Sequence, residues 1–258
     1  MFTARRRSAW NFAASTVVCA AAVVATLTPT AQAVDNAPDP AVAAALQRHA
    51  DGSWTQADVD LIRSIPELAA VVADPTRPVE VTTKEAAFSA SGQAVSPMDG
   101  EPLSPEELAE VMPPAHLDGK PQPGEVTLPA ESADTAGSFG TRITGGRWKM
   151  THVTHTHRSY SGSVIYKYQT WAEFNYGGGK VRAWRYRADD ITNASEIVNV
   201  DNRRIVDSKT STPASSATSK MKRKVELCIF KYGCYSTMYP YVYTTVKGTG
   251  RTSFTSGV

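Results

Sequence analysis

The clearest pattern in this chain is an alternation of apolar and polar positions between residues 164 and 176. Most odd positions after Ile165 are polar, and the even positions are Val164, Tyr166, Tyr168, Thr170, Ala172, Phe174 and Tyr176. A period of two predicts a β-strand with one buried face and one wet face. Glycines occupy 177–179 and predict a hairpin connection, after which residues 181–187 return antiparallel.

The C-terminal part of the chain also has the composition of β-strands. Tyr, Trp, Val and Thr are frequent from residue 138 onward, and we expect further strands at 147–158, 196–207, 222–232 and 238–247. The Ser/Thr-rich stretch 208–219 predicts an exposed loop. Since no helical pattern interrupts these strands, residues 138–258 are expected to form an antiparallel β-sandwich or barrel of about 120 residues.

Residues 34–137 have a different pattern, rich in Ala, Pro, Asp and Glu. Capping side chains at Asp39, Thr55 and Ser104 predict helices that start at Pro40, Gln56 and Pro105, and Pro66 is expected to start a separate turn or helix over 67–72. Trp54 and Phe88 are the only large aromatic residues before Phe139 in this segment. The segment is therefore expected to be a partly helical, partly disordered arm.

The charge distribution sharpens this division. Residues 34–135 contain 18 acidic and 5 basic residues, whereas residues 136–258 contain 7 acidic and 19 basic residues. The total of +2 conceals the difference. A basic domain of this kind is expected to seek an anionic surface, and the acidic arm could cover it as a mask or a propeptide.

The first 33 residues have the features of an export signal. Arg5, Arg6 and Arg7 form a basic start, an uncharged Ala/Val-rich stretch follows, and Ala31-Gln32-Ala33 supplies a site for signal peptidase. We expect cleavage after Ala33, a secreted, extracellular product and no transmembrane anchor after cleavage. The mature chain would then keep two cysteines, Cys228 and Cys234, which an exported protein is expected to join as a disulfide.

The basic residues are the main candidates for binding. They are interleaved with aromatic residues, a combination that suits anionic polymers and glycans. The predicted binding set is Arg182, Trp184, Arg185, Arg187, Arg203, Arg204, Lys220, Lys222, Arg223 and Lys224. A row of tyrosines at 235, 239, 241 and 243 allows either a carbohydrate-stacking face or packing within a sandwich.

Catalytic and metal signals are weaker. His155 and His157 share one face of a strand and could bind a metal ion, or act in catalysis with Glu173, but alternating His and Thr is also typical of an exposed strand face, which we favour. Asp189 and Asp190 are expected in a turn between strands. The sequence contains no nucleophile elbow, zinc-protease helix or phosphate loop, and no cofactor is expected.

The sequence thus favours a secreted, non-catalytic binding protein whose basic, aromatic β domain attaches to an anionic polymer or glycan at a cell surface. Cell-wall polymer, nucleic acid and lipid headgroups all have suitable chemistry. One alternative is an exported hydrolase or toxin with an inhibitory prosegment. Another is a structural extracellular protein whose charges confer solubility.

Overall fold

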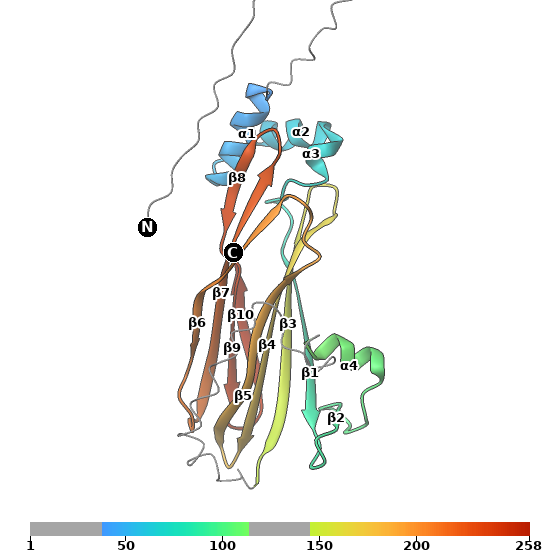
Figure 1. Ribbon diagram of the computed structural model, residues 1–258, viewed down its shortest axis with the longest axis vertical. Coiled ribbons are helices and arrows are strands. Elements are labelled where there is room, and N and C mark those ends of the chain that lie inside the picture. The colour runs from blue at the N-terminus through green and yellow to red at the C-terminus, as the bar shows by residue number, and fades with distance from the viewer. Residues whose placement is uncertain (1–37, 114–144) are drawn as a thin grey trace, which may run out of the picture. The chain divides into compact units, whose positions relative to one another are not determined.

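The computed structural model describes residues 38–113 and 145–258, which contain four helices and ten strands (Figure 1). The helices are α1 (Pro40–Ala50), α2 (Gln56–Ser64), α3 (Pro66–Ala69) and α4 (Pro105–Val111). The strands are β1 (Glu80–Phe88), β2 (Ala94–Val95), β3 (Arg147–Arg158), β4 (Val164–Gly177), β5 (Lys180–Thr192), β6 (Val198–Lys209), β7 (Ser216–Ile229), β8 (Gly233–Met238), β9 (Tyr241–Lys247) and β10 (Thr252–Gly257).

The helices begin where the capping residues predict. The Asp39 carboxylate accepts a hydrogen bond from the Ala41 N–H at 2.8 Å, which satisfies one free donor at the start of α1. Thr55 with Asp58, and Ser104 with Glu107, form reciprocal capping boxes at α2 and α4. The longest helix in the described ranges, α1, has 11 residues, so none of them could span a bilayer, which takes about 20.

The first sheet has the strand order β2-β1-β3-β4-β5, and all of its neighbours are antiparallel. It contains the expected 147–158 and 164–176 strands and the expected hairpin through 177–179. Strand β1 was not expected, yet it pairs with β3 over its whole length, from Glu80 opposite Thr156 to Phe88 opposite Trp148. Its threonines and charges break the apolar alternation that reveals a strand in sequence.

The second sheet has the order β10-β9-β7-β6, with β8 also pairing with β7. The expected loop at 208–219 is wrong at both ends. Ser208 and Lys209 are the last residues of β6 and pair with β7, and 216–219 are the first residues of β7 and pair with β9, from Ser216 opposite Lys247 to Ser219 opposite Thr244. Strands β8 and β10 were not expected. The two sheets remain separate and sandwich-like, so of the two predicted architectures the closed barrel is not formed.

One core joins the helices to both sheets. Apolar residues from the helical segment, such as Leu46 and Ile62, lie in the same buried cluster as Tyr166 of β4 and Leu227 of β7. Figure 1 shows α1 to α3 near the β7–β8 hairpin. The described part of the acidic segment is therefore not a free arm, because its helices and β1 bury apolar surface against the β domain. The boundary expected at residue 137 lies outside the described residues.

The outer face of the first sheet is covered in part by α4. Val111 of α4 packs with Met150 and Trp171, and His152 stacks on Trp171 with ring centroids 4.6 Å apart. The His152 ring also bonds the Glu110 carbonyl oxygen at 2.5 Å through Nδ1 and the Gln169 amide oxygen at 2.9 Å through Nε2. These contacts hold α4 against the outer face of β3. The inner face of the first sheet packs against the second sheet.

The expected disulfide is present at the β7–β8 hairpin. Cys228 and Cys234 are register partners with their sulfurs 2.01 Å apart. The hairpin tip holds Phe230, which is fully exposed, while Ile229 and Tyr232 pack against the core of the molecule. The bond thus anchors a short hairpin on which α1 rests.

Removing this bond should destabilise the protein modestly. Closing a loop of this size restricts the unfolded chain by about 2 kcal/mol in the chain-entropy model. The double change Cys228→Ser with Cys234→Ser is expected to lower the free energy of unfolding by that amount in a urea titration. If the midpoint and slope of the urea unfolding curve were unchanged, the disulfide would not contribute to the stability of the folded protein.

Candidate functional site

Three of the predicted binding arginines lie between the sheets rather than on a surface. The side chains of Arg187, Arg204 and Arg223 are only 8%, 9% and 6% exposed. Arg223 binds the Asp189 carboxylate through Nε at 3.0 Å and Nη2 at 3.1 Å, and Arg204 Nε also pairs with Asp189. Asp207 accepts from Arg187 and from Arg204 at 2.8 Å each. Five charged side chains from β5, β6 and β7 therefore form one ion network, in which two carboxylates pair with three guanidinium groups.

Asp189 is the centre of this network. It lies in β5, not in a turn as expected, and the Tyr168 hydroxyl donates to its Oδ2 at 2.9 Å. Burial alone raises the pKa of the Asp189 carboxyl, but the hydrogen bonds and charges of Arg223 and Arg204 outweigh burial and hold the pKa below its usual value. Burial, together with the neighbouring Asp189 charge, raises the pKa of Tyr168. The network remains ionised and joins the two sheets.

Arg185, Arg182 and Trp184 have structural contacts. Arg185 pairs with the buried Glu173, and its guanidinium lies 4.4 Å from the ring centre of Trp148. Arg182 reaches the backbone around Gly146, where its Nη1 would lie 3.0 Å from an added Cβ. Trp184 donates through Nε1 to the Thr210 carbonyl oxygen at 3.1 Å and packs edge-on against Phe174. These contacts favour packing over ligand binding for β5.

The remaining predicted cations sit in strands β6 and β7. Arg203 is exposed on β6. Lys220, Lys222 and Lys224 alternate with Met221 and Arg223, so the lysines face outward where their neighbours face the core. Lys224 pairs with Glu226 at 2.7 Å. For Lys220 and Lys222 the described residues supply no ion pair.

The outward lysines lie beside the predicted tyrosine row. We call Lys220, Lys222, Lys224, Tyr239, Tyr241 and Tyr243 the lysine–tyrosine face. Lys220 is the register partner of Tyr243, and its Nζ lies 5.5 Å from that ring centre. Lys222 is the partner of Tyr241, and its Nζ lies 5.1 Å from the Tyr239 ring. Of the four tyrosines in the row, only Tyr235 is buried in the core.

Two rings of this face are held next to each other. The Tyr241 and Tyr243 ring centres are 4.9 Å apart with 40° between their planes. Gly257 on β10 makes room for this, because an added Cβ would lie 2.8 Å from Tyr241 Cε1. Tyr241 therefore lies across the backbone of β10, an arrangement that a larger residue at 257 would not permit. Such a platform can stack a flat ring while the lysines meet negative charge.

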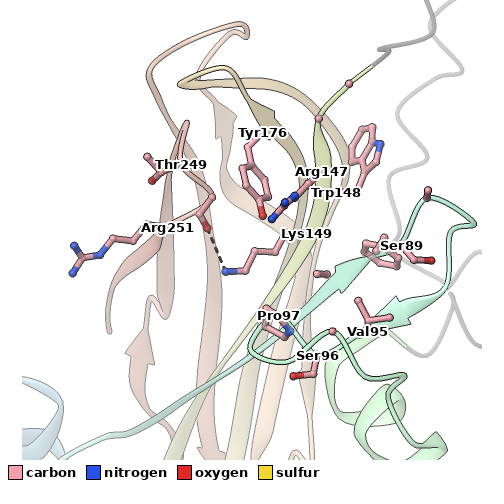
Figure 2. Close-up of a pocket in the computed structure, with 17 residues that line it drawn as sticks. Ser89, Val95, Ser96, Pro97, Arg147, Trp148, Lys149, Tyr176, Thr249 and Arg251 are labelled. Carbon is pink, nitrogen blue, oxygen red and sulfur yellow. Dashed lines mark hydrogen bonds between the residues drawn. The ribbon is translucent and has the colours of Figure 1, made fainter.

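A second cationic region is an open pocket of about 1000 Å³ at the end of the sheets (Figure 2). Arg147, Lys149 and Arg251 line it, and its described lining contains no carboxylate. Figure 2 shows Lys149 donating to the Gly250 carbonyl oxygen, at 3.3 Å, and Lys149 also pairs with Glu85 at 2.7 Å. Gly250 has a φ of +84° and lies against the Tyr176 ring, so no side chain fits there.

The histidines are buried, so the expected exposed strand face is wrong. His152, His155 and His157 are 7%, 1% and 8% exposed. Strand β3 is flanked by β1 and β4, and its odd positions face the second sheet. His155 and His157 therefore lie on the inner face with ring centroids 6.5 Å apart. Burial lowers the pKa of each to about 4, with His155 adding to the effect on His157.

The suggested catalytic trio is not assembled. Glu173 pairs in register with Met150, an even position of β3, so it lies on the opposite face from His155 and His157. Its carboxylate contacts Arg185 instead. Within 38–113 and 145–258, the acid and cysteine cluster with metal-like spacing is Glu226, Cys228 and Cys234, whose cysteines form the disulfide. The described geometry therefore does not bring the His155, His157 and Glu173 side chains together.

The fold and this surface define a two-sheet, sandwich-like protein with a cationic, aromatic outer face. Comparison with protein-family models, curated proteins and solved structures finds no match to this chain.

Breaking the ion network between the sheets should lower the free energy of unfolding. The change Asp189→Ala would leave Arg204 and Arg223 buried without their shared carboxylate, and losses of this kind are about 3–5 kcal/mol. Urea unfolding should report that decrease in stability. Lys84→Ala, which removes an exposed 2.9 Å pair with Glu110, is the control and should change stability by less than about 1 kcal/mol. Equal effects of the two changes would contradict the central role of Asp189.

The buried histidines should make the protein acid-sensitive. Between pH 6.5 and about 4 the unfolded chain protonates His155 and His157 while the folded chain does not, so stability falls as the pH is lowered through this window. The loss is up to about 3 kcal/mol for each imidazole. The double change His155→Asn with His157→Asn should flatten the dependence of the unfolding free energy on pH across this window. A slope equal to that of the unchanged protein would contradict the assignment.

Proposed function

We propose that this protein is a non-catalytic binding protein that attaches to an anionic, sugar-containing polymer through the lysine–tyrosine face. The observation that carries this proposal is the cross-strand pairing of Lys220 with Tyr243 and of Lys222 with Tyr241 on one outward face. Ammonium groups meet acidic substituents while tyrosine rings stack on sugars or bases. Cell-wall polymers and nucleic acids share this chemistry, and an export signal at residues 1–33 would bring the protein to such polymers outside the cell.

The distribution of charge supports this choice of surface. Arg187, Arg204 and Arg223 pair with Asp189 and Asp207 between the sheets. Lys149 and Arg158 pair with Glu85 and Glu80 of β1 at 2.7 and 2.9 Å. The ammonium groups of Lys220 and Lys222 lie over tyrosine rings. Among the described residues, neither lysine forms an ion pair with a carboxylate. Their charge is therefore available to a ligand.

The extent of the face suits a linear partner. Lysines two residues apart on a strand are spaced by about 6–7 Å. Lys247, also exposed, continues the same side of β9 beyond Tyr243 and lies opposite Ser216. Arg147 and Arg251, in the pocket of Figure 2, offer a second contact for an anionic chain.

Masking by the acidic segment is not part of this proposal. The recorded ion pairs that connect residues 38–113 to the later strands go to Lys149 and Arg158 of β3. Those acids serve to hold β1 in the first sheet.

The double change Lys220→Gln with Lys222→Gln should weaken binding to a polyanion and reduce its salt dependence. Each lost phosphate contact lowers the slope of log K against log salt by about 0.7–0.9. We expect a loss of at least tenfold in affinity at low salt for polyglycerol phosphate, heparin or single-stranded DNA, measured by fluorescence anisotropy or a salt-gradient column.

The matched control is Lys180→Gln with Lys231→Gln, which removes two exposed lysines outside the lysine–tyrosine face. It should leave affinity nearly unchanged. Tyr243→Leu should weaken binding without changing the salt slope. An equal loss in the control would mean that net charge alone drives binding, and no binding to any of the three polymers would favour the structural alternative.

A further inference from the structure

The open pocket of Figure 2 is formed where the two sheets end together. Its lining comes from the start of β3, the end of β4, the turn between β9 and β10, and the β1–β2 hairpin. Arg147 and Tyr176 are register partners on β3 and β4, so their side chains share one face of the first sheet. Figure 2 shows both directed into the pocket, whereas Arg251 extends outward from its turn. The volume of about 1000 Å³ is large enough for a small organic ligand.

The pocket carries positive charge that its surroundings do not compensate. The Lys149 ammonium pairs with Glu85 at 2.7 Å, so its charge has a partner. Arg147 and Arg251 are exposed, and neither forms an ion pair or a side-chain hydrogen bond with any of the residues that the structure describes. The two acids that flank Gly100 do not line the pocket. Two guanidinium charges therefore remain for a ligand, and a phosphate monoester carries a matching charge of about −1.5 to −2 at neutral pH.

The pocket also provides hydrogen-bonding groups for the rest of such a ligand. Within 38–113 and 145–258, the hydroxyl groups of Tyr176 and Thr249 have no hydrogen-bond partner. The Lys149 ammonium has three N–H donors, and Glu85 and the Gly250 carbonyl oxygen account for two of them. A phosphate ion alone would leave most of the volume and these groups unused. A sugar that carries the phosphate would use them, because its hydroxyl groups both donate and accept hydrogen bonds.

The pocket adjoins one end of the lysine–tyrosine face. Lys247 continues the exposed side of β9 beyond Tyr243, and its backbone N–H donates to the Arg251 carbonyl oxygen at 2.8 Å. A polymer that lies along this face would therefore bring its end to the turn that lines the pocket.

We propose that this pocket binds a phosphorylated sugar. Arg147 holds the phosphate, Arg251 turns inward from its exposed position to add a second positive charge, and the Tyr176 hydroxyl binds a sugar hydroxyl. The sugar phosphate is either a free small molecule or the terminal unit of a polymer on the lysine–tyrosine face. Binding in the pocket does not depend on that face, because none of the residues that define the face lines the pocket.

The direct test is isothermal titration of the full-length chain with glucose 6-phosphate at low salt. One equivalent should bind, and glucose should not bind. Arg147→Gln should weaken binding about tenfold or more, and Arg251→Gln and Tyr176→Phe should each weaken it about threefold. The matched control is Arg203→Gln, which removes an exposed arginine of β6 outside the pocket and should leave the affinity unchanged. Circular dichroism checks that each variant is folded, and Tyr176→Phe keeps the ring that packs on Gly250.

Three results would overturn this proposal. The first is no binding of glucose 6-phosphate, and the second is an equal loss of affinity in Arg147→Gln and in the Arg203→Gln control. The third is inorganic phosphate that binds as tightly as glucose 6-phosphate, which would remove the sugar from the assignment. Lys220→Gln with Lys222→Gln should leave glucose 6-phosphate binding unchanged, so a failure of the proposed polymer binding can be distinguished from a failure of the pocket.

The source of the sugar phosphate is tested with a single-stranded oligonucleotide that carries a 5′-phosphate and with the same oligonucleotide ending in a 5′-hydroxyl. If the pocket takes the end of a polymer, the 5′-phosphate should raise the affinity and Arg147→Gln should abolish that gain. If the pocket takes a free sugar phosphate, the two oligonucleotides should bind equally and glucose 6-phosphate should still require Arg147.

Discussion

The two-residue period of the β-strand sets the role of the charged side chains in the described strands that form the two sheets. Along β7, Met221, Arg223 and Val225 face the core, and the lysines between them face outward. Arg223 and Lys222 are neighbours in sequence, but one is locked into an ion network and the other stands beside tyrosine rings. The same rule places His155 inside the sandwich and His152 under α4.

Much of the fold could be predicted from the sequence because the signals are local. Capping residues such as Thr55 and Ser104 located the helices, the alternation in β4 located the clearest strand, and the two late cysteines indicated their bond. Strand β1 was missed since its stability comes from pairing with β3, which is distant in sequence. Its own residues carry little of the apolar alternation on which such a prediction depends.

The site was predicted only in part, for a related reason. A run of cations does not reveal which members meet carboxylates from other strands, and Asp189 was assigned to a turn. The alternation along β7 does indicate that Arg223 is buried, because Arg223 lies between Met221 and Val225 at inward positions of the strand. The histidines were misplaced for the same reason. Their alternation with threonine is typical of a solvent-exposed strand face, and this face is buried only because the second sheet covers it.

Pairing between β1 and β3 also bears on how this chain would respond to proteolysis. Nine register pairs and the Glu80–Arg158 and Glu85–Lys149 contacts hold β1 in place independently of the connection through residue 144. A single cut between residues 113 and 145 would yield two polypeptides that stay associated as one nicked molecule. Stripping away the N-terminal fragment would then bare the edge of β3 and the helix-covered core, leaving a remnant prone to self-association.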